Sequence, residues 1–531
     1  MKNNNPIFSI KNFRSFGEDG ADFELAPITV LTGCNSAGKS SLLKALMLLA
    51  KNVKDESVDN LSGKRHLPSL DLKASSVDLK LGGYNKIVNT LNKKGEIEMT
   101  YAIWSTFLHE EVVCRRIYKV KEAVLNDGAL KYFSIEKKDG TVVFRGLPST
   151  GSVVLEKGEV AFFDFVQEEE HFEAIKGCYE KFQLAYGYAY YNMLKQKMDA
   201  RENPEKSKLY KRVVEKIEDG KKSLNRYGMT IEEAEKYDMP SLIAWHQANV
   251  TDEISADVKD YRDDLDKEEK EEMKREVYHT LVINEIVSPW FFSKFASIDS
   301  STNKISRVYN VDDKDKLSVL LCNIVNRTKA FRYHSNAFIN KWLKAFGIGD
   351  FLEIEGTDEG LGVRVFVDNK GVRQLLADEG FGLTQIISIL LQIDGLKNRY
   401  GRRGADVASN EVTFYEKTVI CIEEPEVHLH PKYQSMLADL FVEAYQKYNI
   451  HFIIETHSEY LIRKLQVMVA DKENTLTSND VSLNYVEKDE SGTSHNRKIE
   501  IQEDGRLNGS FGRGFYDEAG SLSRQLFTLN K

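Results

Sequence analysis

The sequence predicts an α/β protein that carries a helical insertion. Short apolar segments that are typical of strands, such as 28–31 and 419–422, lie towards both ends of the chain and alternate with helical patterns. The middle is rich in Glu, Lys, Ala, Met and Tyr, and it places apolar residues such as Ile254 and Val258 at helical spacing. We therefore expect an N-terminal lobe, a helical insertion that is a candidate for partner docking, and a C-terminal lobe, over residues 1–165, 166–299 and 300–531.

Composition favours a globular protein inside the cell. The 531 residues include 73 basic and 82 acidic side chains, so the net charge of −9 repels nucleic-acid backbones overall. Five cysteines without a C-x-x-C pair fit a reducing compartment. No apolar run approaches the ~18 residues of a membrane span. We expect a cytoplasmic protein without membrane contact.

Strands are predicted from short β-rich segments bounded by turn residues. The two lobes each contain several of them, and helices separate those of the C-terminal lobe. The predicted strands cover residues 28–31, 97–102, 142–144, 351–355, 363–367, 419–422, 450–454, 481–486 and 497–502.

A glycine-rich phosphate-binding motif follows the first of these strands. Residues 33–40 read G-x-x-x-x-G-K-S and lie between an apolar strand and an amphipathic helix. Such a loop turns its backbone N–H groups towards an anion, while Lys39 reaches the β- and γ-phosphates and the Ser40 hydroxyl ligates magnesium. The predicted nucleotide-binding residues here are Gly33, Asn35, Gly38, Lys39, Ser40 and Ser41.

Two further strands end in polar side chains. Glu423 and Glu424 follow the buried strand 419–422, at the sheet edge where ligands of open α/β sheets bind. We interpret Glu423 as a Mg²⁺ ligand, direct or through water, and Glu424 as the base that accepts a proton from the attacking water. His457 follows strand 450–454 and is predicted to sense the γ-phosphate; taken alone, the acids could cap a helix and the histidine could be structural.

The order of these motifs resembles the ABC/SMC-type AAA ATPases, and more narrowly their RecF-like and overcoming-lysogenization-defect-like branch. Asn12–Phe16 is similar to the opening strand of that branch, and the resemblance covers residues 6–105 and 300–520. It implies an ABC-type P-loop ATPase head with a mixed sheet, with ATP and Mg²⁺ as cofactors and ADP and phosphate as products.

The same resemblance assigns a signature segment to residues 378–385. In that family, the segment completes the site of an opposing subunit, so the chain is expected to form an ATP-dependent head-to-head dimer or a higher oligomer. Three features depart from the pattern of that family. The signature segment does not read L-S-G-G-Q, and Glu423 stands where the broader family has an Asp. Residues 79–85, at about the position of the Q-loop, contain no glutamine. The resemblance places His428 and His430 in a loop between subunits, and no third metal ligand follows them at useful spacing. The signature residues expected to contact nucleotide are Gly380, Gly382, Thr384 and Gln385.

Within this branch, the chain is most similar to stand-alone ATPases of prokaryotic anti-phage systems, of the Septu type and of retron operons. The supporting segments are 340–348, the strand pair 481–486 and 497–502, and the ending 514–518. The resemblance implies a separate HNH-type nuclease as partner and effector. In retron systems it also implies a reverse transcriptase and its RNA–DNA product.

Two other functions remain open from the sequence. An SMC- or RecF-like repair or recombination ATPase would show a heptad coiled coil or a stronger basic surface. A nuclease of the overcoming-lysogenization-defect type needs acidic motifs beyond Glu487 and Asp489, within the 74 residues (531 − 457) that follow His457.

Charge runs give one further pair of hypotheses. The insertion carries a basic group within 206–222 and, over 251–276, 12 acidic and 6 basic residues, which suits either solvated helices or a docking arm. A basic loop before the second motif is expected to be solvated or to touch nucleic acid; it contains Lys397, Arg399, Arg402 and Arg403.

Overall fold

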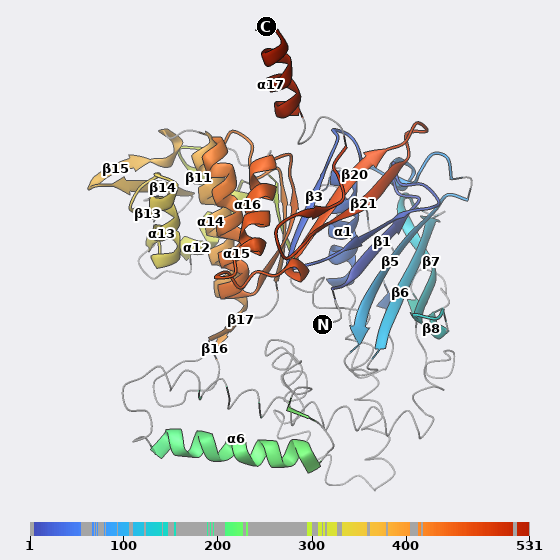
Figure 1. Cartoon of the computed structure of the whole chain (residues 1–531), viewed down its shortest axis with the longest axis horizontal. Coiled ribbons are helices and arrows are strands. Elements are labelled where there is room, and N and C mark those ends of the chain that lie inside the picture. The colour runs from blue at the N-terminus through green and yellow to red at the C-terminus, as the bar shows by residue number, and fades with distance from the viewer. Residues whose placement is uncertain are drawn as a thin grey trace.

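The computed structural model describes most of the two lobes and short stretches of the middle of the chain (Figure 1). The described residues are 5–54, 66–67, 70, 72, 79, 81–92, 94–105, 110–121, 124–140, 142–146, 153–154, 188, 192, 195, 208–226, 230–231, 295–299, 306–310, 312–313, 316–326, 332–357, 362–378, 381–403, 413–415, 418–512 and 518–529.

A seven-stranded mixed sheet lies at the centre of the protein. The strand that precedes the glycine-rich loop, β3, pairs in parallel with β19 on one side and β20 on the other, so both ends of the chain build one sheet. The last two strands run antiparallel, which confirms the predicted α/β fold with a mixed sheet. In spatial order the strands are β10 (Phe295–Asp299), β18 (Thr418–Glu423), β19 (Ile450–Glu455), β3 (Ile28–Gly33), β20 (Val481–Lys488), β21 (Ser494–Ile501) and β22 (Leu507–Asn508).

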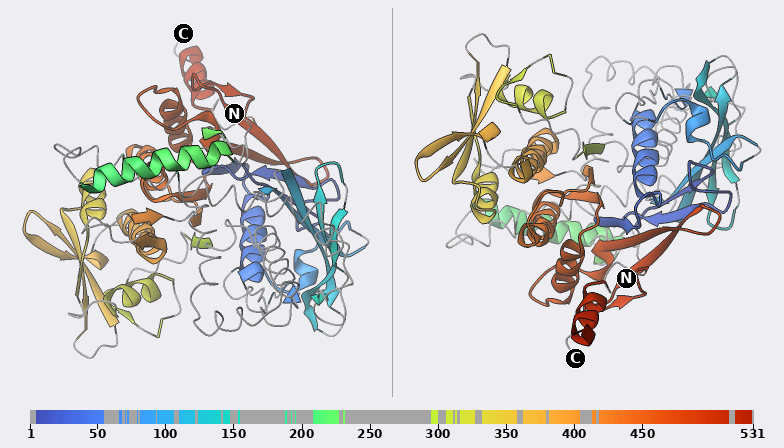
Figure 2. Two further views of the ribbon diagram at one scale, coloured as in Figure 1. Left: turned by 90° about the horizontal axis from the view of Figure 1, so that it is seen from below. Right: turned by 90° about the horizontal axis from the view of Figure 1, so that it is seen from above.

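A six-stranded antiparallel sheet forms a second layer. Helix α1 (Lys39–Lys54) lies between this sheet and the central one, as Figure 2 shows from above. Its buried Leu42 and Leu46 join one core with Phe8 of the second sheet and Val419 of the central sheet. The strands, in spatial order, are β2 (Ala21–Glu24), β1 (Ile7–Lys11), β5 (Glu96–Ser105), β6 (Glu110–Lys121), β7 (Val124–Lys137) and β8 (Val142–Gly146).

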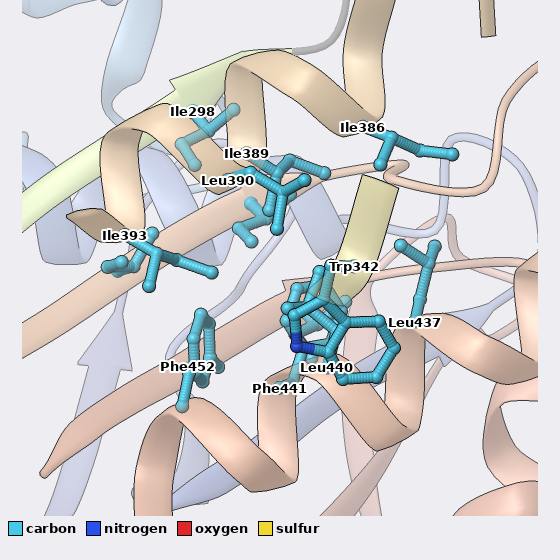
Figure 3. Packing of buried hydrophobic residues seen from close by; sticks show 14 of the residues in the cluster. Ile298, Trp342, Ile386, Ile389, Leu390, Ile393, Leu437, Leu440, Phe441 and Phe452 are labelled. Atoms are coloured by element: carbon cyan, nitrogen blue, oxygen red, sulfur yellow. The ribbon is translucent and has the colours of Figure 1, made fainter. Parts of the chain in front are cut away.

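Helices cover the opposite face of the central sheet. Because side chains alternate across a strand, Val419 and Cys421 join the α1 core while Ile420 and Ile422 join the helical one. Figure 3 shows Ile389, Leu390 and Ile393 of α14 in this second core, with Phe452 of β19. The helices that contribute to this second core are α12 (Lys316–Asn326), α13 (Ala337–Ala345), α14 (Phe381–Tyr400), α15 (Pro431–Tyr448) and α16 (Glu459–Ala470).

A smaller sheet projects at the side of these helices (Figure 1). It consists of β11 (Tyr309–Asn310), β14 (Gly362–Asn369), β13 (Phe351–Gly356) and β12 (Arg332–His334), with β15 (Val372–Leu375) paired to β14. Its β12 side is tied to α14, since Tyr333 Oη donates to the buried Asp394 at 2.9 Å. Further described elements are β4 (His66–Leu67), α3 (Tyr84–Ile87), β9 (Val153–Val154), η3 (Leu376–Asp378), η4 (Ser478–Asp480) and α17 (Glu518–Leu529).

The middle of the chain is described only in part. Helix α6 (Lys208–Arg226) carries part of the basic group, with Lys221 paired to Glu218 at 2.7 Å. Ile254, Val258 and the acidic run 251–276 lie outside the described residues. Strand β10 pairs with β18, so residues 295–299 belong to the central sheet. The three-part division of the chain stays a prediction.

The sequence predicts a solvated loop or a nucleic-acid contact before β18, whereas the described residues there form the end of a helix and a short hairpin. Lys397 and Arg399 lie in the last turns of α14, and β16 (Gly401–Arg403) pairs with β17 (Thr413–Tyr415). The glycine that suggested a loop begins this short hairpin instead. Among the helices of the described segments, none has the length and apolar content needed to cross a membrane.

Candidate nucleotide-binding site

The loop between β3 and α1 has the backbone shape of an anion-binding nest. Positive φ angles occur at Gly33 (137°), Ser36 (58°) and Gly38 (115°), which curl the loop tightly between the strand and the helix. Asn35 is exposed at its tip, and the Ser41 N–H donates to the Gly38 carbonyl at 3.0 Å as α1 begins. An anion held by this loop would also face the positive end of the α1 dipole.

Packing against the C-terminal strands adds a reason for both glycines. A Cβ atom at Gly33 would lie 2.0 Å from the Val486 carbonyl oxygen. At Gly38 it would lie 2.8 Å from the Ser494 hydroxyl oxygen. Ser494 Oγ also donates to the Ala37 carbonyl at 2.5 Å. Strands β20 and β21 therefore contact the loop and restrain its backbone.

Lys39 is folded back onto the loop that it follows. Its Nζ donates to the carbonyls of Gly33 at 3.1 Å and Cys34 at 2.8 Å, and the residue is buried. Burial lowers the Lys39 pKa, while the nearby Glu455 opposes that shift. This ammonium is therefore positioned within the loop to bind a phosphate in place of the two carbonyls.

Ser40 is joined to an acid that the sequence analysis did not assign to the site. Its hydroxyl donates to Glu455 Oε1 at 2.8 Å, and Glu455 is only 4% exposed. Burial raises the pKa of Glu455, although the Ser40 hydrogen bond and Lys39 act against the rise. Glu455 ends β19 in register with Glu423 at the end of β18, so both acids lie on the same face of the sheet. Its place at the end of the strand next to β18 is the sequence signal that could have found it.

These groups fit a magnesium ion. Glu455 Oε2 is buried and has no hydrogen-bond partner among the described residues. The neighbouring atoms that could ligate a metal are hydroxyl and carboxylate oxygens, which Mg²⁺ prefers. Magnesium in nucleotide sites takes one or two protein ligands and fills the rest with phosphate and water. The described residues contain no cluster of three or more His, Cys, Asp or Glu that would hold a metal alone.

Glu424 has a strained backbone at the end of β18. Its φ of 44° is left-handed, a conformation that costs a non-glycine residue about 1–3 kcal/mol and that is concentrated at functional sites. Its N–H donates to the Glu455 carbonyl at 2.8 Å. The side chain is 44% exposed, and its Oε1 lies 3.9 Å from His457 Nε2. That separation exceeds a direct hydrogen bond and suits a bridging water.

His457 faces the same space, and its surroundings favour the neutral imidazole. Burial lowers its pKa, the positive charge of Lys39 lowers it further, and Glu424 acts in the opposite direction. A neutral imidazole can donate one hydrogen bond without adding charge beside Lys39.

Glu426 is a second acid that the sequence analysis did not place in the site. It is 7% exposed, and its Oε1 accepts from the His457 N–H at 2.6 Å. Burial raises its pKa, whereas the His457 hydrogen bond opposes the rise. The turn after Glu424 and the turn that carries His457 are thereby joined.

The signature residues lie close to this turn, within the same subunit. Gly380 is outside the described residues. Thr384 and Gln385 are 1% and 2% exposed, and Gln385 Nε2 donates to the Glu424 carbonyl at 3.1 Å. A Cβ at Gly382 would lie 2.7 Å from the His428 carbonyl oxygen. These side chains therefore face the interior of their own subunit in this conformation.

His430 has a structural role. It is the N-cap of α15, where its side chain accepts from the Lys432 N–H at 3.3 Å and Pro431 follows as the first helical residue. His428 has a left-handed backbone, with φ of 63°.

Comparison with known families agrees with this geometry. A family model described as "AAA ATPase domain" matches residues 7–462, which include the loop, both acidic strand ends and His457. The chain belongs to the AAA ATPase domain family. A second model, "Protein of unknown function (DUF3696)", matches residues 476–526 of this AAA ATPase, the region that contains β20 and β21. No curated protein matches this AAA ATPase.

Solved SMC heads are among the structures similar to this AAA ATPase. One is the Smc head domain of Pyrococcus furiosus with an extended coiled coil, bound to the C-terminal domain of ScpA. It is 11% identical, with 98% of this chain and 99% of that chain covered and a TM-score of 0.35. Another is the SMC head domain from Thermotoga maritima, at 10% identity, 93% and 98% coverage and a TM-score of 0.35.

Proposed function

We propose that this AAA ATPase binds Mg²⁺ and ATP in the Gly33–Ser41 loop and hydrolyses the ATP to ADP and phosphate. The observation that carries the proposal is the hydrogen bond between Ser40 and Glu455, which joins the phosphate loop to the acidic end of the central sheet. Lys39, Glu424 and His457 interact electrostatically with one another, which supports a single site formed by these three side chains.

Each side chain has a distinct task in this reaction. Lys39 leaves the loop carbonyls to bind the β- and γ-phosphate oxygens. Glu424 accepts the proton of the attacking water, and His457 donates a hydrogen bond to the γ-phosphate. Ser40, Glu423 and Glu455 would hold Mg²⁺, which neutralises phosphate charge when bound. Asn35 and Ser41 complete the loop around the phosphates.

Two copies are proposed to close around the nucleotide. Helix α14 is 20 residues long, and its N-terminal end, next to the signature segment, offers backbone N–H groups to an anion. A γ-phosphate held by one copy would thus be bound by the Gly380–Gly382 segment of the other. The result is an ATP-dependent head-to-head dimer, on its own or within a higher oligomer.

In the cell, we assign this ATPase to a prokaryotic anti-phage system in which it controls a separate HNH-type nuclease. The motif order and the C-terminal strand pair support this role through their resemblance to Septu-type and retron ATPases. A reverse transcriptase and its RNA–DNA product are further partners in the retron arrangement. The use of ATP and the five cysteines without a C-x-x-C pair support a cytoplasmic location for the complex.

Two measurements test the proposal. Purified protein should release phosphate from ATP with Mg²⁺, and an inactive wild type would contradict the enzymatic assignment. Expression with the neighbouring genes in a phage-sensitive bacterium should lower plaque formation, and the Glu424→Gln variant should remove that protection. Equal protection by this variant and by the wild type would show that the defence role does not depend on ATP hydrolysis.

A further inference from the structure

Gln385 makes a hydrogen bond within its own subunit that would not be needed if its role were to bind the nucleotide of a partner subunit. It lies in the second turn of α14 and is 2% exposed. Its Nε2 donates to the carbonyl of Glu424 in the same chain at 3.1 Å. Its Oε1 is also buried and has no hydrogen-bond partner in the described part of the protein. The only polar link that the amide makes there is to the backbone of the proposed catalytic base.

That link holds one side of a strained residue. Glu424 keeps its left-handed φ of 44° because both of its backbone groups are fixed. The N–H donates to the Glu455 carbonyl at 2.8 Å, and the Glu424 carbonyl accepts from Gln385 Nε2 at 3.1 Å and from the Val427 N–H at 3.3 Å. Removing the Gln385 donor leaves the carbonyl with the longer Val427 bond, so the Glu424 backbone, and with it the direction of the carboxylate, is restrained less.

The start of α14 and the turn after Glu424 are also packed without space between them. A Cβ at Gly382 would meet the His428 carbonyl oxygen at 2.7 Å and Leu429 Cδ2 at 2.9 Å. Further along α14, Ile386 and Ile389 are fully or almost fully buried in the same core as Phe452 (Figure 3). The helix start cannot shift without moving the turn that it touches.

That turn is itself connected to the strand end that carries His457. Gln434 Nε2 donates to the Leu429 carbonyl at 3.0 Å, and Gln434 Oε1 accepts from Ser458 Oγ at 2.7 Å. Glu426 holds the His457 N–H. A displacement of α14 therefore reaches both Glu424 and His457 through continuous contacts.

We propose that Gln385 is a positioning residue that acts on Glu424 of its own subunit, and that it couples the position of the α14 N-terminus to hydrolysis there. The inference rests on the proposed function and deepens it. When the α14 N-terminus engages the nucleotide of the partner copy, Gln385 carries that change to the water-binding carboxylate of its own site. The two sites of the dimer are thereby coupled.

The first test separates binding from chemistry. Gln385→Met keeps an unbranched side chain of similar length and removes the donor. We expect kcat to fall about tenfold or more while the Kd for ATP stays unchanged, because a displaced base slows only the chemical step. Gln392→Met is the matched control on α14, since its Nε2 donates to Ser388 Oγ of the same helix, at 3.3 Å. An unchanged kcat for Gln385→Met would overturn the proposal.

Gln385→Leu serves as the second variant if the methionine variant does not fold. It has a similar volume and removes the donor that faces the Glu424 carbonyl. A loss of kcat with intact ATP binding is again expected, and wild-type kcat again contradicts the proposal.

Mixed dimers distinguish an effect within a subunit from one across the interface. In the first mixture, Gln385→Met subunits pair with Glu424→Gln subunits, so the hydrolysing site belongs to the chain that lacks Gln385. In the second, wild-type subunits pair with chains carrying both substitutions, so that site keeps its own Gln385 and lacks that of its partner. We expect the first mixture to turn over about tenfold or more slowly than the second.

Equal rates, or a slower second mixture, would overturn the action within one subunit. Failure of the proposed function is distinguishable, because it would be visible in the wild type as an absence of ATP turnover. Failure of the Gln385 assignment would leave an active wild type and would be visible as an unchanged kcat of Gln385→Met or in the comparison of the two mixtures.

Discussion

The hydroxyl of Ser40 donates to Glu455 Oε1 at 2.8 Å, across the gap between the first turn of α1 and the end of β19. The two residues are 415 positions apart in the chain and meet because β19 pairs with β3 in parallel. A buried carboxylate whose second oxygen lacks a partner among the described residues, beside a serine hydroxyl, is suited to a divalent cation.

Magnesium dependence should therefore change when either partner is altered. Ser40→Ala and Glu455→Gln each remove an oxygen ligand or an orienting charge, so we expect the Mg²⁺ concentration for half-maximal ATPase activity to rise about tenfold or more. A Mg²⁺ titration of ATPase rate measures this. Ser435→Ala is the control, because its hydroxyl donates to the Lys432 carbonyl at the surface. An unchanged requirement in both site variants would remove the pair from metal binding.

Turnover should depend on Glu424. Glu424→Gln keeps the size of the side chain but cannot accept a proton, so we expect ATP binding to persist while kcat falls on the order of 10²-fold or more. Glu459→Gln is a suitable control on α16, where Glu459 pairs with Arg463. Wild-type turnover in Glu424→Gln would assign the base to another residue.

Nucleotide affinity should depend on Lys39. Lys39→Ala deletes the ammonium that the loop holds on the Gly33 and Cys34 carbonyls, so calorimetry should show ATP affinity reduced about tenfold or more. Lys51→Ala, three turns further along α1, controls for the loss of a lysine from this helix. Equal affinity in Lys39→Ala and Lys51→Ala would contradict the assignment of the loop.

The sequence predicts the fold well because its strongest signals are local. Apolar segments such as 28–31 and 450–454 correspond to β3 and β19, and the G-x-x-x-x-G-K-S pattern lies between strand and helix as expected. The pairing of β3 with β19 and β20 joins segments that are far apart in the sequence. The mixed sheet is predicted from the family resemblance, because hydrophobic periodicity does not show which strands pair.

Residues that act through long-range contacts were harder to predict. Glu455 ends β19 and Glu426 lies in the turn after β18, and their burial depends on α1 and on the His457 turn. Gln385 was expected to face a partner's phosphate, because a signature motif shows which residues follow a helix start but not which way the side chains face. Its hydrogen bond to Glu424 is set by how α14 packs on the sheet.

Stability should depend on pH through Glu426. Burial raises its pKa in the folded protein, so folding favours the protonated acid. That contribution is present below the unfolded value of ~4.3 and is lost as pH rises through the folded pKa, by about 1.4 kcal/mol for each pH unit that separates the two pKa values. Glu426→Gln removes the ionisation and keeps an acceptor for the His457 N–H.

The free energy of unfolding of Glu426→Gln should therefore rise relative to wild type as pH increases from the unfolded value of ~4.3 through the folded pKa of Glu426. Urea unfolding at several pH values measures the difference. Glu426→Ala is the comparison variant, since it leaves the His457 N–H without its acceptor and should be less stable than Glu426→Gln throughout. A constant difference between Glu426→Gln and wild type would show that Glu426 stays ionised in the folded protein.

Assembly should follow the nucleotide. A γ-phosphate bound by Lys39 in one copy and by the α14 N-terminus in another is fully satisfied only in the dimer, so ATP should favour association by about 1–3 kcal/mol. Light scattering on Glu424→Gln, which retains ATP, should give a larger mass with ATP than with ADP or without nucleotide. Gly382 is a poor site for a disrupting substitution, because its Cβ would meet the His428 carbonyl within the same subunit.

The matched control combines Lys39→Ala with Glu424→Gln, a protein that should keep the mass of the nucleotide-free form in all three conditions. If Glu424→Gln has one mass throughout, the value itself separates two accounts. A constant dimer mass indicates subunits held together by surfaces other than the nucleotide. A constant monomer mass indicates an ATPase that completes its site within one chain, and in that case the hydrogen bond from Gln385 to Glu424 would couple α14 to hydrolysis without any partner.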